Sequence, residues 1–295
     1  MPNRIRHWRD WPLFARLAVT MVLAAILPAL VLTVIDTVSL RTSLLSGLEQ
    51  RNLDRSSATT AEIRSYLQDK LGGVKTIAAS PAVFTFFSGP SASRKDSSLP
   101  TELVTQAREG GYESLIVTDR SGSVVAASDN RLLGISFATN PAFVWALGGM
   151  SVIDDPLYDA RDGQVFLHFS TPVNLPGATA AGTVICRVTL ASLDAAVSRD
   201  TNYGGNGEYG ILWNEHGVRL SQPSQDSLRF RPLAPLTAAA AREMTSIQRY
   251  GPATSEKLKD DSRLQILLER STAVLNNPAT SSSVEIAGDN GQILI

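Results

Sequence analysis

The sequence predicts an α+β protein with an N-terminal transmembrane helix, a long stalk helix and two tandem antiparallel-sheet modules, the second of them truncated. Three observations predict this architecture. Residues 17–35 carry no charge, apolar residues then recur at helical spacing as far as residue 79, and the remainder alternates strand-like runs with turn signals. We expect five segments along the chain, and they cover residues 1–16, 17–35, 36–110, 111–200 and 201–295.

Residues 17–35 are predicted to span a membrane, because a helix of this length extends roughly 28 Å, close to the thickness of bilayer hydrocarbon. Residues 1–16 contain four arginines and a single acid, Asp10. The positive-inside rule therefore places this N-terminus in the cytoplasm and the bulk of the chain outside. A cleaved signal peptide is the alternative, but its apolar core usually covers only about 7 to 15 residues.

The composition argues against several functions. The 27 basic and 28 acidic side chains leave a mildly acidic exterior once the N-terminal arginines are set aside, so no nucleic acid is expected as a partner. The one cysteine, Cys186, lies in an apolar run and is expected to be a buried hydrophobe rather than a reactive thiol. The histidines, His7, His168 and His216, are too scattered for a zinc site, so neither a metal nor a cofactor is expected.

Residues 37–79 are predicted to form the stalk helix, because they lack proline and their apolar residues recur in steps of three and four. Polar residues 50–60 interrupt this apolar stripe, which suits a helix packed on a partner helix along part of its length. We therefore expect a parallel homodimer through the stalk, with an ordinary core helix as the alternative. Ser80 and Pro81 should end the helix.

The first sheet module is predicted to contain strands with few crossover helices, and therefore an antiparallel sheet with helices on one side. A polar loop over residues 88–100 precedes it. Its expected elements are a hairpin over 115–118 and 123–127 with its turn at 119–122, a helix over 140–147, strands over 165–170 and 183–190 separated by a loop with Pro172, and a short helix over 191–197.

The second module begins with a hairpin, 211–213 and 218–220, that resembles the first hairpin about a hundred residues earlier. Helices over 237–247 and 263–275 and a last hairpin, 284–286 with 292–295, are expected to follow. Because the sequence stops inside that last strand, we expect it to be a fragment of a longer protein.

Residues 140–197 contain a series of short motifs: Ala146-Leu147-Gly148, Pro156 to Tyr158, Asp162-Gly163, Pro172-Val173, Gly182, and Leu190 with Leu193. In the order and spacing of these motifs, residues 140–197 resemble the membrane-distal module of double Cache (dCache) sensor domains, and residues 209–295 resemble the membrane-proximal module without its last strands. This resemblance implies two tandem PAS-like (Cache) modules that bind a small molecule outside the cell.

The resemblance implies the extracytoplasmic ligand-sensing region of a bacterial receptor in the inner (plasma) membrane. Such receptors continue into a histidine kinase, a chemoreceptor signalling domain or a diguanylate cyclase, and we expect that output domain to lie beyond residue 295. No catalytic residue is assigned in this segment. A membrane-anchored structural or adhesive ectodomain is the alternative; a hydrolase is less favoured, because the sequence lacks Gly-x-Ser-x-Gly and His-Glu-x-x-His motifs.

The resemblance places five residues at the ligand pocket: Trp145 on a helix, Tyr158 and Asp159 in a loop, His168 on a strand and Arg187 on the last strand. Amino-acid-binding members of the family have a Trp-Tyr pair and an acid there. Here Ala146 follows Trp145, and Arg187 stands where the acid is expected. We therefore expect a small carboxylate or other anion at Arg187, whose guanidinium suits such a group.

Each of these residues also has a purely structural interpretation. Arg187 is as readily explained by a salt bridge with Asp154, Asp155 or Asp159, and Trp145 is more often a core residue than a pocket residue. His168 is either a pH-sensitive group or, more commonly, a hydrogen-bonded strand histidine. The acids Asp154, Asp155, Asp159 and Asp162 do not have EF-hand spacing, so a solvated acidic turn is preferred over a calcium site.

Overall fold

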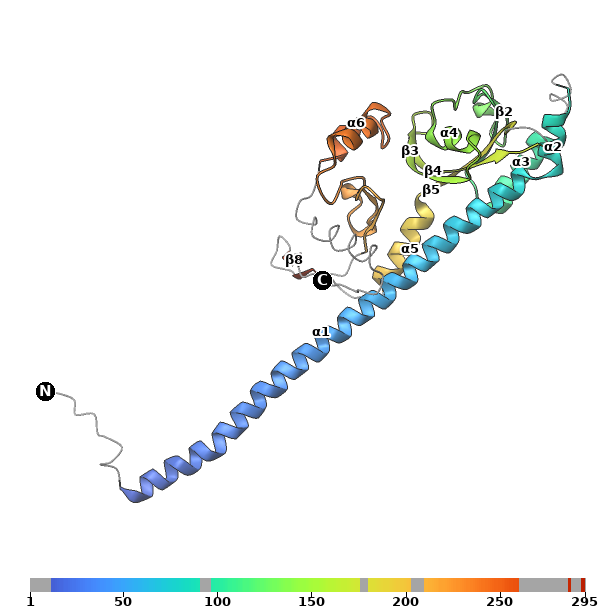
Figure 1. The fold of residues 1–295 in the computed structure, drawn as a ribbon. Coiled ribbons are helices and arrows are strands. Elements are labelled where there is room, and N and C mark those ends of the chain that lie inside the picture. Colours follow the sequence, from blue (N-terminus) through green and yellow to red (C-terminus); the bar gives the residue numbers. More distant parts are fainter. Residues whose placement is uncertain are drawn as a thin grey trace. The chain divides into compact units, whose positions relative to one another are not determined.

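The structure, a computed structural model, describes residues 12–90, 97–175, 180–202, 210–259, 286–287 and 293–294 (Figure 1). The chain divides into two parts, Met1–Asp54 and Arg55–Ile295, and each is described by itself. The predicted helix over 263–275 lies outside the described residues.

Helix α1 covers Leu13–Ala78, so the expected stalk helix is confirmed and ends within a residue of its predicted end. Ser80 then caps the next helix, α2 (Pro81–Ser88), because its hydroxyl accepts a hydrogen bond from the Val83 amide. Among the residues that the structure describes, no helix is both long and apolar enough to cross a membrane. The span predicted over residues 17–35 stays a prediction.

The predicted polar loop over residues 88–100 lies between two helices that the sequence analysis missed. The first is α2, and the second is α3 (Leu99–Gly110), which ends at Gly111 in the left-handed conformation. Residues 91–96 lie outside the description. Helix α3 buries Leu99, Leu103 and Ala107, an i, i+4, i+8 series on one face.

Five antiparallel strands form the main sheet, in the order β2-β1-β5-β4-β3. The predicted hairpin and the two predicted later strands are confirmed. β3 was not predicted as a strand, and Pro172, expected between strands, lies inside β4. The bounds are β1 (Ser114–Asp119), β2 (Val124–Ala127), β3 (Val152–Asp159), β4 (Gln164–Val173) and β5 (Gly182–Thr189).

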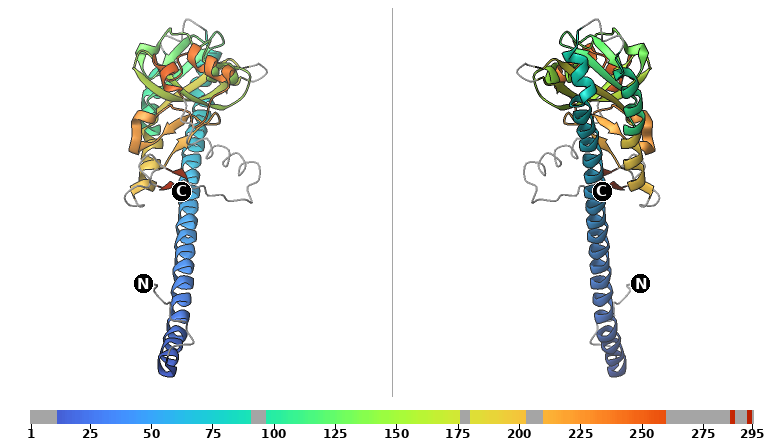
Figure 2. Two further views of the ribbon diagram at one scale, coloured as in Figure 1. Left: turned by 90° about the vertical axis from the view of Figure 1, so that its left-hand side faces the viewer. Right: turned by 90° about the vertical axis from the view of Figure 1, so that its right-hand side faces the viewer.

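Helices cover both faces of this sheet, so the expectation of helices on one side was wrong (Figures 1 and 2). On one face, strand residues such as Leu115, Phe169 and Cys186 join a core with α1, α2, α3 and α5. On the other face, Ile116 and Ile185 pack with Phe143 of helix α4 (Pro141–Leu147). Alternate residues of each strand point to opposite faces, which separates these two clusters.

Two predictions about single residues on and beside the sheet are confirmed. The Asn140 side chain accepts hydrogen bonds from the amides of Ala142 and Phe143, so α4 starts at Pro141 as expected. Cys186 is fully buried, and burial raises the pKa of its thiol, which fits a packing residue. The short 3-10 helix η3 (Asn130–Leu132) lies between β2 and α4.

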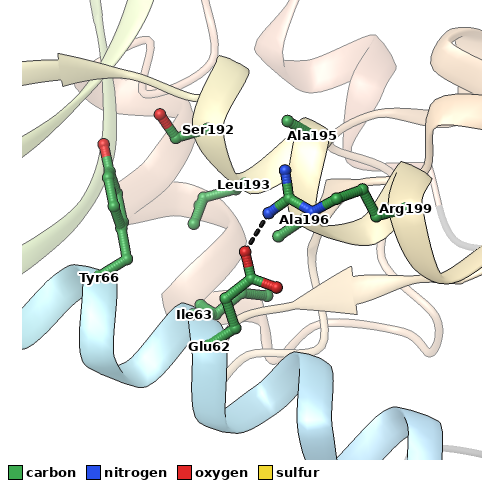
Figure 3. Close-up of a pocket in the computed structure, with 8 residues that line it drawn as sticks. All are labelled: Glu62, Ile63, Tyr66, Ser192, Leu193, Ala195, Ala196 and Arg199. Atoms are coloured by element: carbon green, nitrogen blue, oxygen red, sulfur yellow. Dashed lines mark hydrogen bonds and ion pairs between the residues drawn. The ribbon is translucent and has the colours of Figure 1, made fainter.

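Helix α5 (Ala191–Asn202) follows β5 after one residue and packs on α1. A cavity of about 240 Å³ lies between them. Figure 3 shows its lining residues, among them Ile63 and Tyr66 of α1 and Ser192, Leu193, Ala195 and Ala196 of α5. Glu62 and Arg199 form an ion pair at this cavity, and both side chains are at least half exposed. Such an exposed pair contributes little to stability, so the apolar contacts join α5 to α1.

The region after α5 is smaller and less regular. Both hairpins expected there are present, as β6 with β7 and as β8 with β9, and the helix expected over 237–247 is present as α6, with Thr237 as its N-cap. The boundaries between the expected segments stay predictions. The elements are β6 (Leu212–Trp213), β7 (Arg219–Ser221), η4 (Pro223–Leu228), α6 (Ala238–Ser246), α7 (Thr254–Lys257), β8 (Ile286–Ala287) and β9 (Ile293–Leu294).

Gly182, the glycine at the start of β5, has no room for a side chain. A Cβ built there would collide with the carbonyl oxygen of Thr118 and lie 2.9 Å from the Phe87 ring. We expect Gly182→Ala to lower the free energy of unfolding by about 1 to 3 kcal/mol, because the backbones of β1 and β5 must separate. Urea unfolding of the full chain, followed by circular dichroism, measures this loss.

Gly72 in α1 is the matched control, since a Cβ there meets nothing within 4 Å. Gly72→Ala is expected to raise the free energy of unfolding by roughly 0.5 to 1 kcal/mol, because alanine restricts the unfolded chain more than glycine does. Equal effects of the two substitutions would contradict the steric explanation for Gly182.

Candidate ligand-binding site

A row of four polar residues crosses the main sheet on the face that α4 covers. Ser114 of β1 pairs with Arg187 of β5, Arg187 pairs with His168 of β4, and His168 pairs with Asp154 of β3. Directly paired residues in an antiparallel sheet point to the same face. Ser114, His168 and Arg187 are at most 3% exposed. The row is therefore a buried polar surface, whereas the opposite face of the same strands is apolar.

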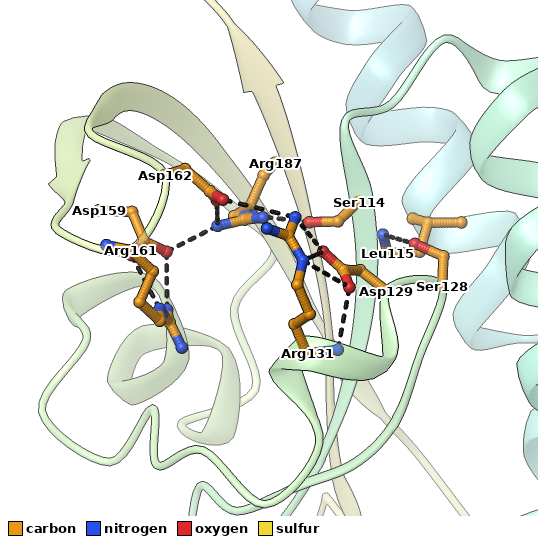
Figure 4. Close-up of polar contacts among 9 residues, drawn as sticks. All are labelled: Ser114, Leu115, Ser128, Asp129, Arg131, Asp159, Arg161, Asp162 and Arg187. Atoms are coloured by element: carbon orange, nitrogen blue, oxygen red, sulfur yellow. Dashed lines mark hydrogen bonds and ion pairs between the residues drawn. The ribbon is translucent and has the colours of Figure 1, made fainter.

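Arg187 is the centre of this row, and it is a buried ion-pair partner (Figure 4). Its Nη1 donates to Oδ2 of Asp159 at 2.7 Å and lies 3.0 Å from Oδ2 of Asp162, and its Nε donates to the Ser114 hydroxyl at 2.6 Å. The guanidinium carbon lies 4.6 Å from the centre of the Phe166 ring. The structure therefore shows Arg187 in a salt bridge with two aspartates, and one of them, Asp159, was among the partners expected from the sequence.

The carboxylates of this network are held by further arginines. Arg161 binds Asp159 through both its side chain and its amide, at 2.7 to 3.0 Å. Burial alone would raise the pKa of Asp159, but the hydrogen bonds from Arg161 outweigh burial and lower it. Arg131 lies 3.5 Å from Asp162 and forms a second pair with Asp129. Three arginines therefore balance three aspartates in one connected network.

Asp159 and Asp162 do not form the solvated acidic turn that the sequence favoured. Their side chains are only 11% and 17% exposed, because the β3–β4 turn folds over Arg187. Asp159 also lies on β3 rather than in a loop. Among the described residues, no group of three His, Cys, Asp or Glu side chains is placed to hold a metal ion.

His168 is fully enclosed, and its Nδ1 has no hydrogen-bond partner among the described residues. Burial is the main reason that its pKa is lowered to about 3, and the positive charge of Arg187 contributes in the same direction. The imidazole is therefore neutral at physiological pH, which disagrees with a pH-sensitive role near neutrality. The hydrogen bonding expected of a strand histidine is also incomplete, because Nδ1 of the ring has no partner among the described residues.

Two other polar atoms beside His168 have no partner among the described residues. They are Oδ2 of Asp154 and the hydroxyl of Ser170, which is fully buried two residues after His168. Burial raises the pKa of Asp154, and the nearby Arg249 guanidinium opposes this shift only in part. Buried polar atoms in native proteins nearly always have a partner, so these three atoms make this face of the sheet the candidate binding site.

The other two predicted site residues lie outside the Arg187 network. Trp145 is 55% exposed on α4, so it is not a core residue, and it lines a cavity with Asp154. Tyr158 lies on β3 rather than in a loop. Its amide donates to the Arg249 carbonyl at 2.8 Å, and Gly251 lies beside its ring. The structure therefore brings Asp159, His168 and Arg187 together, and leaves Trp145 and Tyr158 outside that group.

Sequence reasoning missed Ser114, Asp129, Arg131 and Ser170 as members of the site. A usable signal was present in β4, where His168 and Ser170 alternate with apolar residues in an otherwise hydrophobic run. A strand with one apolar and one polar buried face has this pattern. The other three residues come from distant parts of the chain, and their proximity depends on the strand register.

This fold resembles that of solved Cache-type sensor and ligand-binding domains. One is the sensor domain of the Vibrio cholerae (V. cholerae) histidine kinase DctB, with a TM-score of 0.58 and 17% identity over 69% of this chain and 77% of that one. Another is the ligand-binding domain of the Pseudomonas fluorescens chemoreceptor CtaA in complex with L-valine. Its TM-score is 0.50, and the two are 18% identical over 64% of this chain and 80% of that one. Comparison of the sequence with family models and with curated proteins found no match.

Proposed function

We propose that this chain is the ligand-sensing region of a membrane-bound signalling receptor. The observation that carries the proposal is the buried polar row on the α4 face of the sheet, with its unpartnered atoms of Asp154, His168 and Ser170. Burial of polar atoms without hydrogen bonds costs folding free energy, and a bound ligand would supply the missing hydrogen bonds. Structural neighbours that are sensor and ligand-binding domains support the same interpretation.

The ligand proposed for this row is a small carboxylate that binds Arg187. Because Asp159 and Asp162 already pair with Arg187, such a ligand must replace one of them. Asp162 is the weaker partner, since its oxygen lies 3.0 Å from Nη1 and it accepts no hydrogen bond from a backbone amide of the turn. L-valine and L-alanine, bound in the CtaA structures, both carry a carboxylate, which supports this class of ligand.

This exchange suggests a route from ligand to signal. Release of Asp162 would free the β3–β4 turn and change the environment of β5. Helix α5 follows β5 directly and packs against Ile63 and Tyr66 of α1, so a shift of β5 would reach the stalk helix (Figure 3). Shifts of one or two ångströms between packed helices are a common form of such switching.

Titration calorimetry of the full chain tests the proposed ligand class. We expect succinate or another small carboxylate to bind, n-butylamine not to bind at Arg187, and Asp162→Asn to tighten carboxylate binding about tenfold by removing the competing charge. Asp226→Asn is the matched control, because Asp226 is an exposed aspartate that pairs with a different arginine, Arg229. Preference for amines at this site, or the same carboxylate affinity in Asp162→Asn and wild type, would refute the exchange.

Binding also separates the sensor from a structural or adhesive ectodomain. A ligand that binds only the folded state raises the melting temperature by mass action, so a sensor should respond to members of a metabolite screen. A scaffold would respond to none of them.

We further propose that residues 17–35 anchor the receptor in the inner membrane, with residues 36–295 outside the cytoplasm and the stalks of two copies parallel. The uncharged sequence of residues 17–35 and the arginines before it support this topology. Membrane fractionation, followed by labelling of single cysteines introduced on either side of residues 17–35, tests it. Recovery of the intact chain in the soluble fraction would refute the anchor, and cross-linking of cysteines along α1 would test the dimer.

A further inference from the structure

A cavity of about 700 Å³ lies beside the polar row, which it meets at Asp154, between the main sheet and residues 210–259. Its walls come from α1, α4, α5, α6, β3, β4, the β6–β7 hairpin and Arg249 after α6. Ligand pockets commonly measure roughly 300 to 1,000 Å³ and are mostly apolar with a few polar groups. This cavity has that character, since its apolar walls include Ile63, Leu67, Leu167, Leu193, Leu220 and Met244.

Two tryptophans from distant parts of the chain line this cavity. Trp145 comes from α4 and is 55% exposed, and Trp213 comes from β6. Met150 and Ile153 beside Trp145 are also exposed, at 47% and 38%. Large apolar side chains gathered on one exposed surface are typical of binding sites. The electron-rich face of an indole ring also attracts organic cations.

The polar groups of the cavity are predominantly acidic. Four carboxylates line it, from Asp154, Asp155, Glu215 and Glu243, against a single guanidinium, Arg249. Arg249 is already engaged, because its Nη1 donates to the Asp155 carbonyl at 3.3 Å and lies 3.8 Å from Asp154. The Asn214 amide donates to the Asp155 carboxylate at 2.6 Å, which orients that group.

Asp154 supplies a carboxylate that is partly open to this cavity, since its side chain is 14% exposed and lines the cavity. An ammonium group that enters the cavity would pair with the exposed part of this carboxylate, and Asp155, Glu215 and Glu243 line the same cavity. An anion would meet like charges instead.

We propose that this cavity is a second ligand site and that it binds a small organic amine. The ammonium group pairs with Asp154, and the apolar part of the amine lies against Trp145 and Trp213. The site is separate from the Arg187 network, so it does not depend on the carboxylate exchange proposed for that network. Because both modules and α1 line it, an amine bound there contacts the sheet and the stalk helix at once.

Tryptophan fluorescence of the full chain in a non-ionic detergent tests the second site directly, since two of the four tryptophans line the cavity. We expect n-butylamine and choline to change the emission saturably, and butyrate, which has the opposite charge, to leave it unchanged. No saturable change with either amine, or an equal change with butyrate, would overturn the proposal.

Calorimetry with n-butylamine on variants of the cavity residues identifies which side chains bind the amine. We expect Asp154→Asn to weaken it about tenfold and Trp213→Leu about fivefold, consistent with the usual strength of charge and cation–π contacts. Glu256→Gln is the matched control, because Glu256 is an exposed acid on α7 that does not line the cavity. Wild-type affinity in both Asp154→Asn and Trp213→Leu would refute the site.

Asp162→Asn separates the two proposals. It is expected to leave amine affinity unchanged, since Asp162 belongs to the Arg187 network and does not line this cavity. Loss of amine binding in Asp162→Asn would place the amine in the Arg187 network and overturn the second site. Amine binding that persists while all carboxylates fail to bind would overturn only the carboxylate exchange.

Discussion

Arg187→Met is expected to lower the free energy of unfolding by about 3 to 5 kcal/mol. The substitution keeps an apolar stem of similar length but removes the charge that balances Asp159 and Asp162. Both carboxylates are largely buried, and a buried charge that loses its partner is strongly destabilising. The midpoint of urea unfolding, compared with wild type at neutral pH, measures this effect.

Arg131→Met is the matched control for Arg187→Met. Arg131 belongs to the same network and lies 3.5 Å from Asp162, but its side chain is 75% exposed. Exposed ion pairs contribute about 0 to 1 kcal/mol, so we expect a loss within that range. Equal losses of unfolding free energy in the two variants would show that burial does not determine how much the Arg187 ion pairs contribute to stability.

A second change identifies the cause of the loss. Adding Asp162→Asn to the Arg187→Met variant removes one of the two carboxylates that lost their buried partner and keep only the more exposed Arg131 or Arg161. We expect the double variant to recover at least about 1 kcal/mol of the stability lost, because neighbouring substitutions in one network are not additive. A double variant that is less stable than Arg187→Met would indicate that lost packing on Phe166, rather than unpaired charge, causes the destabilisation.

Local signals in the sequence were sufficient for most of the sheet and its capping helices. The hairpin of β1 and β2 followed from apolar runs around an Asp-to-Gly turn, and α4 followed from Asn140 before Pro141. β3 was missed because Asp154, Asp155, Pro156 and Asp159 are residues that usually mark loops. Arg187 and Arg249, distant in the sequence, compensate its charges, and no local pattern reveals that compensation.

The site shows the same division between local and long-range information. Asp159 was among the acids considered for Arg187, but Asp162 and Ser114 were not, because their proximity depends on the register of β5 with β1 and on the turn after β3. Trp145 was expected at the ligand pocket, with a core position as the alternative. Helix α4 buries Ala142, Phe143 and Ala146, which leaves Trp145 on its outer face, and a seven-residue helix is too short for a periodic pattern to show this.

His168 is expected to make the protein lose stability as the pH falls from neutral. Its pKa is about 3 in the folded protein, against 6.5 for the ordinary side chain. Between these two values the unfolded chain takes up a proton that the folded chain does not, so each pH unit below 6.5 favours unfolding by about 1.4 kcal/mol. At about pH 4.5 the accumulated loss from this one residue is close to 3 kcal/mol, and it is absent at about pH 7.5.

His168→Gln isolates this contribution, because glutamine keeps a polar side chain that does not titrate. Urea unfolding of both proteins at about pH 7.5 and about pH 4.5 gives two differences in stability, and we expect that of the variant to be smaller by nearly 3 kcal/mol. Asp154, which has a raised pKa, acts in the opposite direction, but it is present in both proteins and cancels. Parallel losses in the wild type and the variant would mean that the imidazole is protonated in the folded state, and therefore that Arg187 and the surrounding sheet do not exclude a charge from this position.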